Sequence, residues 1–228
     1  MHTFFIENIS DELIELDENE SKHAIRVMRL SVGKPVRVVN GLGTEYLGEI
    51  VDDHPKKTVI GINESSTASP PPYKVGIALA PTKSNDRTEL FLEKATEIGL
   101  TDFFPIVASN SERQRFNPER WKKITISALK QSGRLWLPRI HDVIDLPNFV
   151  DRCDFKQKLI AHCEPLEKQE LKKLDTDIDS VILIGPEGDF TTDEIELAIA
   201  SGFDPVSLGV NRLRTETAGI VATTLLRN

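Results

Sequence analysis

The sequence predicts an α/β protein with a mainly parallel sheet, preceded by a small β-rich module. Residues 181–184 are four consecutive apolar residues, followed by a Gly-Pro-Glu-Gly loop and apolar residues at helical spacing, which is the order strand, tight loop, helix. Similar strand and helix patterns alternate five times after a proline-rich break at residues 63–73. Such alternation favours parallel strands with helices on both faces.

The chain before the break carries mostly short strand patterns. We expect strands near residues 4–6, 35–39, 46–51 and 58–62. The Asn-Gly-Leu-Gly segment at residues 40–43 predicts a hairpin turn between two of them. Apolar and basic residues mixed over residues 21–30 predict one short helix. Barrel-like packing would let these few strands bury one core.

The break itself divides the chain. Its three consecutive prolines exclude a helix or a central strand, so we predict domains at residues 1–72 and 73–228. The second domain is expected to contain strands at residues 75–80, 103–107, 159–161, 181–184 and 206–208. Its helices are expected at residues 89–98, 118–133, 166–174 and 217–226, with another after a Thr191-to-Glu194 capping box.

Composition limits the class of protein. The 228 residues hold no apolar run long enough to cross a membrane, and the first residues lack a signal peptide pattern, so we expect a cytoplasmic protein. The two cysteines, Cys153 and Cys163, form no Cys-x-x-Cys pair, which indicates neither a disulfide framework nor a metal site.

Positive charge is concentrated in one segment. The net charge is −8, yet residues 111–139 contain eight Lys or Arg against two Glu. Such a segment can contact nucleic acid phosphates, although a solvated helix face explains any single charge equally well.

Three loops follow predicted strands and carry unusual residues. They are residues 161–164, 185–188 and 208–218. Loops at the carboxyl ends of parallel strands are where ligands bind, and glycine lets the backbone approach a ligand. A plain β-to-α turn remains the alternative for the Gly-Pro-Glu-Gly loop. Arg214 and Glu216 lie at the start of the last helix, either as an anion site or as a salt-bridged helix cap.

These loops carry a family resemblance. Gly-Pro-Glu-Gly at residues 185–188, and Leu-Gly followed by Leu-Arg-Thr-Glu-Thr-Ala at residues 208–218, resemble the motifs of the RsmE-type methyltransferases. That family modifies N3 of a uracil in 16S ribosomal RNA and belongs to the SPOUT superfamily. Matching motifs also occur at residues 23–33, at Lys83, and at residues 93–100 and 131–138.

The resemblance implies a fold, a cofactor and partners. It implies a SPOUT-like parallel sheet with a deep trefoil knot, a PUA-like N-terminal β-barrel, a homodimer, and 16S rRNA or the small ribosomal subunit as substrate. It also implies S-adenosylmethionine as cofactor. The expected cofactor-binding residues are Ala161, His162, Gly185, Glu187, Gly188, Leu208, Gly209 and Leu213.

Methylation of uracil N3 also requires removal of the N3 proton. We expect Arg214 to stabilise charge on the uracil oxygens, and Glu216 to orient Arg214 or accept the proton. Glu187 is the other candidate base, unless it holds the loop. The residues expected to contact RNA are Arg26, Arg29, Lys83, Arg113, Arg115 and Arg134.

Three positions depart from the family pattern. Asp189 stands where the motif has a second glycine, Lys130 replaces an acid, and Arg212 replaces an apolar residue. A non-catalytic RNA-binding or ribosome-associated protein that keeps the fold is therefore the competing interpretation. An enzyme of phosphate-bearing nucleotides is disfavoured, since the loop lacks the Lys-Ser/Thr of a P-loop and the spaced glycines of a dinucleotide fingerprint.

Overall fold

The computed structural model describes residues 1–9, 12–112, 116–175 and 177–227. By its internal packing the chain forms two compact units. Residues Met1–Pro70 with Leu129–Leu137 form the N-terminal unit, and Pro71–Ala128 with Pro138–Asn228 form the C-terminal unit. Nothing in the sequence pattern indicated that residues 129–137 pack with the N-terminal unit.

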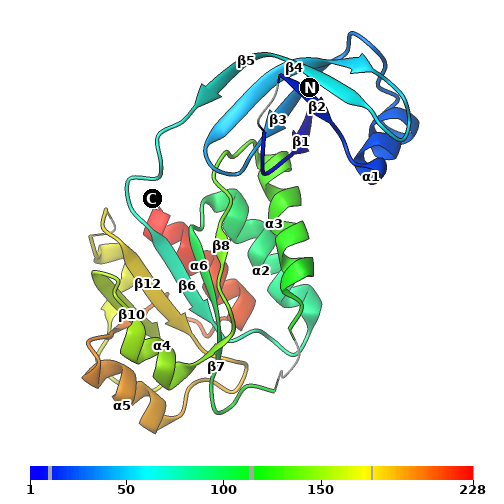
Figure 1. Ribbon diagram of the computed structural model, residues 1–228. Helices are drawn as coiled ribbons and strands as arrows, with labels where there is room; N and C mark the ends of the chain where they lie inside the picture. Colours follow the sequence, from blue (N-terminus) through cyan, green and yellow to red (C-terminus); the bar gives the residue numbers. More distant parts are fainter. Residues whose placement is uncertain (10–11, 113–115, 176, 228) are drawn as a thin grey trace. The chain divides into compact units, whose positions relative to one another are not determined.

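The N-terminal unit is built on one five-stranded sheet (Figure 1). Its order is β1(His2–Phe5), β3(Pro35–Val39), β4(Thr44–Asp52), β5(Val59–Thr67), β2(Leu13–Glu15), with β1 parallel to β3 and the other pairs antiparallel. Register shifts interrupt the β4–β5 pairing at Leu47/Gly48 and Ile50/Asp52, and such bulges bend a sheet. The fully buried core includes Phe4, Val36 and Ile60. The predicted small β-rich module is confirmed.

The predicted hairpin turn at residues 40–43 is also confirmed. Asn40 accepts hydrogen bonds on its side-chain oxygen from the amides of Leu42 at 2.8 Å and Thr44 at 3.1 Å. Gly41 and Gly43 have φ angles of 73° and 92°, which favour glycine. The β3–β4 register follows from this turn.

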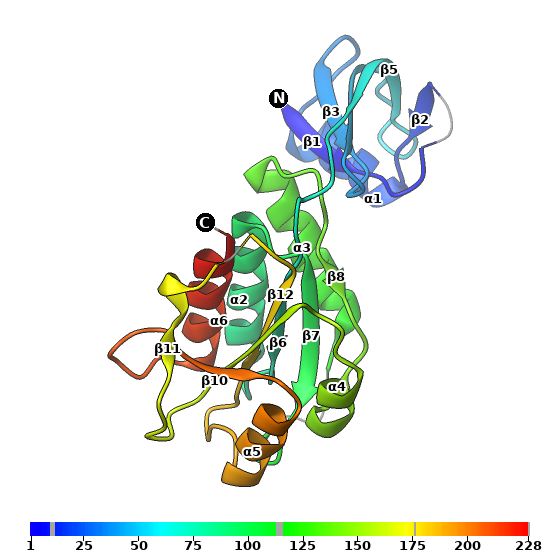
Figure 2. The same cartoon turned by 90° about the vertical axis from the view of Figure 1, so that its left-hand side faces the viewer.

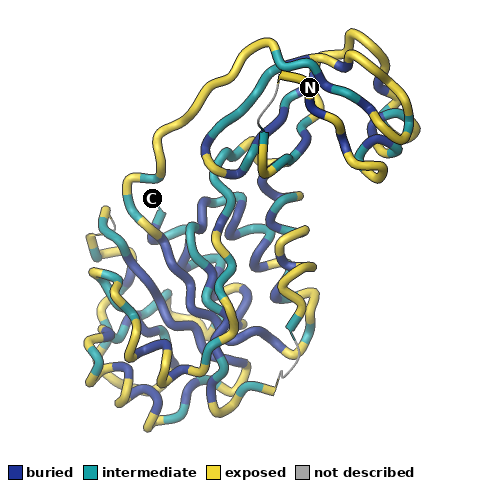
Figure 3. The backbone as a smooth tube through the Cα atoms, viewed as in Figure 1, coloured by how far each residue is buried: buried dark blue, intermediate teal, exposed yellow. Residues whose placement is uncertain are grey.

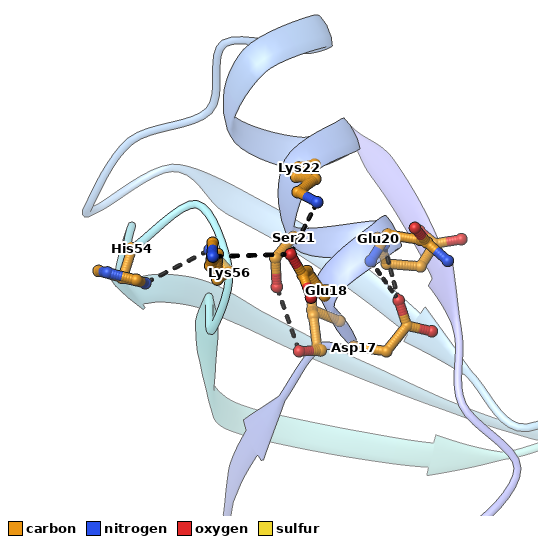
Figure 4. Close-up of polar contacts among 9 residues, drawn as sticks. Asp17, Glu18, Glu20, Ser21, Lys22, His54 and Lys56 are labelled. Atoms are coloured by element: carbon orange, nitrogen blue, oxygen red, sulfur yellow. Dashed lines mark hydrogen bonds and ion pairs between the residues drawn. The ribbon is translucent and has the colours of Figure 1, made fainter.

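The short helix predicted over residues 21–30 is present, but it begins and ends three residues earlier. The structure has α1(Glu18–Lys22), followed by one π-helical turn at His23–Val27. The helix begins earlier because the Asp17 carboxylate accepts two amides of its first turn at 2.8 Å (Figure 4). Lys22 pairs with Glu18 at 2.7 Å, and the Ser21 hydroxyl donates to the carbonyl of Leu16 (Figure 4). The ion pair lies within α1, whereas the Ser21 hydroxyl attaches the helix to the preceding strand segment.

The C-terminal unit contains an eight-stranded sheet in which all the pairs are parallel. The order is β11(Gln169–Glu170), β13(Asp204–Ser207), β10(Gln157–Ala161), β12(Ser180–Ile184), β6(Val75–Leu79), β7(Asp102–Val107), β8(Arg139–Ile140), with β9(Ile144–Asp145) also on β7. Every residue of β6 and β12 is buried, as their apolar runs predict (Figure 3). The predicted parallel sheet is confirmed. The trefoil knot stays a prediction.

Helices cover both faces of this sheet (Figure 2). One apolar layer joins the sheet to α2(Asn85–Ile98), α3(Pro118–Ser132) and α6(Thr215–Arg227), and it includes Ile77, Phe91 and Ala222. The other joins it to α4(Leu146–Arg152) and α5(Thr192–Ala200), and it includes Ala78 and Ile195. Neighbouring residues of β6 thus face opposite layers, as the period of two in a strand requires.

The helix predicted at residues 166–174 was wrong. Gln169 and Glu170 form the short edge strand β11, and a 3-10 turn follows at Leu171–Lys173. Only Leu171 of this segment is fully buried, so no apolar face exists for a helix to pack. Among the described residues, no helix has both the length and the apolar character needed to span a membrane.

Candidate functional site

A cavity of about 610 Å³ lies where β10, β12 and β13 end. Its walls are the three loops singled out from the sequence, together with parts of α2 and α6. It therefore occupies the position at which open α/β sheets bind ligands. All the residues expected to bind the cofactor line it, except Gly188: Ala161, His162, Gly185, Glu187, Leu208, Gly209 and Leu213.

Gly188 is exposed and does not line the cavity, and it lies against the loop after β7. A Cβ built on it would lie 3.1 Å from the Cβ of Asn110, so this position tolerates no larger residue without movement. The Asn110 side-chain amide donates to the carbonyls of Gly188 at 3.3 Å and Asp189 at 3.0 Å. The role of Gly188 in this structure is close packing of the loop.

Three further contacts hold the Gly-Pro-Glu-Gly loop. The Glu187 carboxylate accepts the backbone amide of Lys83 at 3.1 Å, and its carbonyl accepts the Arg212 guanidinium at 3.3 Å. Thr215, at the start of α6, donates its hydroxyl to the carbonyl of Gly185 at 3.0 Å. Segments far apart in the chain therefore fix the loop before any ligand binds.

Asp189 takes a backbone conformation that suits glycine. Its φ is 64°, in the left-handed region that non-glycine residues rarely adopt, which accounts for the glycine of the family pattern. Its carboxylate accepts the amide of Cys163 at 2.7 Å and that of Phe190 at 2.8 Å. The Asp189 side chain, which the family pattern lacks, thus links the loop after β12 to the loop after β10.

His162 lines the cavity and has polar side-chain atoms without a partner in the described part of the chain. Its side chain is nearly buried, and neither ring nitrogen has a hydrogen-bond partner within the described residues. Burial and the nearby Lys168 lower the pKa of His162, so its ring is neutral at neutral pH. A neutral imidazole can both donate and accept a hydrogen bond from a ligand.

Cys163 is adjacent and also lines the cavity. Burial and the Asp189 carboxylate raise the pKa of its thiol. It is therefore a protonated thiol at neutral pH, and not a reactive thiolate.

The predicted catalytic residues lie in different environments. Arg214 and Glu187 are exposed and line the cavity, whereas Glu216 is 6% exposed and lies behind the wall. Glu216 Oε1 is 3.8 Å from Nε of Arg87, and Glu216 Oε2 has no hydrogen-bond partner among the described residues. In this structure Glu216 therefore pairs with Arg87.

Arg87, which was not predicted as a site residue, lies in the first turn of α2 and lines the cavity. A signal existed, because α2 follows the carboxyl end of β6, the same sheet edge from which the three loops emerge. A basic residue in the first turn after such a strand is a candidate for the site.

The residues expected to bind RNA fall in both units. Arg26 and Arg29 are exposed in the N-terminal unit, and Arg134, which is half-buried, belongs to the same unit. Lys83 belongs to the C-terminal unit, and its exposed ammonium lies 2.8 Å from Glu112, which raises the pKa of Lys83. Arg113 and Arg115 lie outside the described residues.

No group of His, Cys, Asp or Glu suited to a metal ion occurs in the part of the chain that the structure describes. The cavity walls instead combine backbone groups, small residues and a few charged side chains. Such walls suit an organic ligand of moderate size.

Comparison with known proteins gives two family matches. Residues 69–227 match the model of an RNA methyltransferase domain, and residues 16–62 match that of an RNA methyltransferase PUA domain. Among curated proteins, the ribosomal RNA small subunit methyltransferase E of Synechocystis is 32% identical over 95% of this chain and 73% of its own length. That of Rickettsia conorii is 31% identical, over 94% of this chain and 89% of its own.

Solved structures show the same fold over the whole chain. A probable rRNA-methyltransferase from Porphyromonas gingivalis matches with a TM-score of 0.92 and 34% identity, covering 100% of this chain and 98% of its own. A ribosomal RNA small subunit methyltransferase E from Neisseria gonorrhoeae, bound to S-adenosyl methionine, matches with a TM-score of 0.85 and 25% identity, over 98% and 95% of the two chains.

Proposed function

This chain belongs to the RNA methyltransferase family of the ribosomal RNA small subunit methyltransferases E, and we propose that its cavity binds S-adenosylmethionine to methylate N3 of a uracil in 16S rRNA. The observation that carries this proposal is the cavity formed by the three loops after β10, β12 and β13. The cofactor bound to the Neisseria gonorrhoeae relative supports the catalytic interpretation over a non-catalytic RNA-binding protein.

The residues present fit this cofactor. A cavity of about 610 Å³ falls within the usual range for ligands of this size. His162, whose ring nitrogens have no hydrogen-bond partner among the described residues, lines the cavity. Gly209 has a φ of 142° and no atom within 4 Å of a built Cβ, so its backbone lies open to the cavity. Ala161, Leu208 and Leu213 add apolar surface.

The bound cofactor supplies an electrophilic methyl group, and the protein must activate the uracil. Arg214 would stabilise the negative charge that develops on the uracil oxygens as the N3 proton leaves. Glu187 lines the cavity and would accept that proton, while Glu216, behind the wall, would position the basic side chains through Arg87.

The first experiment is calorimetric titration with S-adenosylmethionine, with ATP as the control ligand. We expect saturable binding of the first and none of the second. Arg214→Ala should keep the cofactor affinity within about twofold and reduce methyl transfer by about 100-fold or more, the size found when one charge-stabilising donor is removed. Arg152→Ala, an exposed change in α4, is the matched control. Full methyl transfer by a folded Arg214→Ala variant would contradict the assignment.

Further parts of the proposal concern assembly and RNA. The family resemblance supports a homodimer, and an rRNA substrate supports a cytoplasmic location. Sedimentation equilibrium would test the first, and cell fractionation the second. Arg26, Arg29, Lys83, Arg113, Arg115 and Arg134 would contact RNA phosphates.

A further inference from the structure

Asp189 supplies a negative charge as well as a structural link. The residue is half-buried and lines the cavity. Its two carboxylate oxygens each accept one backbone amide, from Cys163 and Phe190. Both donors are neutral, so these bonds hold the carboxylate in place without neutralising it.

The other charged side chains around the cavity are placed differently. Glu187 is more exposed than Asp189, and water screens exposed charges more strongly. The Lys168 ammonium donates to the backbone carbonyls of His162, at 2.8 Å, and Glu164. The Arg212 guanidinium donates to the backbone carbonyl of Glu187. Asp189 is thus a fixed and partly desolvated anion in a cavity that also contains cations.

We propose that Asp189 makes this cavity prefer the cationic methyl donor over the neutral product of the reaction. The inference rests on the proposed function. S-adenosylmethionine carries a sulfonium cation, which becomes a neutral thioether when the methyl group leaves. A fixed carboxylate in the same cavity attracts the first and not the second. The glycine of the family pattern has no such charge, so the preference would be a property of this chain.

Two variants separate the charge from the structural link. Asn at this position keeps one of the two oxygen acceptors and tolerates a φ of 64°, but removes the charge. Gly suits the same φ and removes both the charge and the link to Cys163. Asp193→Asn is the matched control, because Asp193 is an exposed carboxylate in the first turn of α5.

The experiment is calorimetric titration of the wild type and the three variants at one ionic strength. The ligands are S-adenosylmethionine, S-adenosylhomocysteine, and an analogue with an amine in place of the sulfonium. In Asp189→Asn, the Kd for both cationic ligands should rise about three- to tenfold, while that for S-adenosylhomocysteine should change less than about twofold. Asp189→Gly should weaken all three ligands, and Asp193→Asn none.

Each other outcome is informative. An equal loss of affinity for charged and neutral ligands in Asp189→Asn would overturn the proposal and leave Asp189 a structural role only. Unchanged affinities would overturn it as well. If the wild type bound none of the ligands, the proposed function itself would fail, which the wild-type titration distinguishes from a failure specific to Asp189. Urea denaturation of each variant checks that it is folded.

Discussion

Glu194 fastens the start of α5 to the loop after β7, and its removal should destabilise the C-terminal unit. One carboxylate oxygen accepts the amide of Ser109 at 2.7 Å and its hydroxyl at 2.9 Å. The other accepts the amide of Thr191 at 2.9 Å and its hydroxyl at 3.2 Å, which completes the predicted capping box. Glu194 is 8% exposed, so water reaches these groups poorly.

The size of the loss in stability follows from the hydrogen-bond donors that lose their acceptor in Glu194→Ala. Two backbone amides, those of Ser109 and Thr191, lose their acceptor, each at about 1–3 kcal/mol. We therefore expect the free energy of unfolding to fall by about 2–6 kcal/mol, a large part of the usual stability of a domain. Glu194→Gln keeps one acceptor oxygen and should lose less.

The assay is urea denaturation followed by circular dichroism at a helix wavelength. This signal reports the C-terminal unit, because α2, α5 and α6 belong to it. Glu196→Ala, an exposed change on the same helix, should stay within about 0.5 kcal/mol of the wild type. If Glu194→Ala unfolded at the same urea concentration as Glu196→Ala, the buried hydrogen bonds would not contribute as argued.

Three further predictions concern packing, pH and RNA. Gly219→Ala should cost about 1–3 kcal/mol in urea denaturation, because its Cβ would lie 2.7 Å from the Phe91 ring, whereas exposed Thr217→Ala should be neutral. Burial raises the pKa of Asp102, but the hydrogen bonds from His141 and Thr101 outweigh this effect, so the pKa of Asp102 is lowered overall. The ionised Asp102 therefore contributes its full stability above the ordinary Asp pKa, and this contribution is lost as the pH falls through the lower pKa of the folded state. In Asp102→Asn the free energy of unfolding should consequently decrease less steeply with falling pH below about pH 4. Arg26→Gln should reduce the slope of RNA affinity against salt by about 0.7–0.9, and Arg152→Ala should leave it unchanged. A steeper loss of stability with falling pH in Asp102→Asn would contradict the pH prediction. An unchanged salt dependence of RNA affinity in Arg26→Gln would contradict the RNA prediction.

The strands and the site loops were accessible from the sequence because they depend on local patterns. The buried run at residues 181–184 requires a central strand, and the residues after it identify the loop that lines the cavity. The capping box was equally local, since Thr191 and Glu194 are three positions apart. The segment at residues 166–174 misled the prediction because short apolar spacing alone does not show what a helix would pack against.

The contacts that shape the site were not accessible, because they join residues far apart in the chain. Lys83 and Glu187 are separated by 104 positions, Ser109 and Glu194 by 85, and Cys163 and Asp189 by 26. The spacing of apolar residues in the sequence does not indicate such pairings. The same holds for Arg87, whose link to Glu216 exists only once α2 and α6 pack together.

Asp189 shows how a local rule and a distant contact combine. The family pattern predicts glycine there, and the φ of 64° confirms that the backbone still has the conformation that favours glycine. An aspartate is therefore expected to be unfavourable unless something compensates for it. The compensation is visible only in three dimensions, where its carboxylate bonds the Cys163 amide and lies in the wall of the cavity. A position that departs from its family while keeping the strained backbone is thus a reason to look for a new contact, and here that contact places charge in the wall of the cavity.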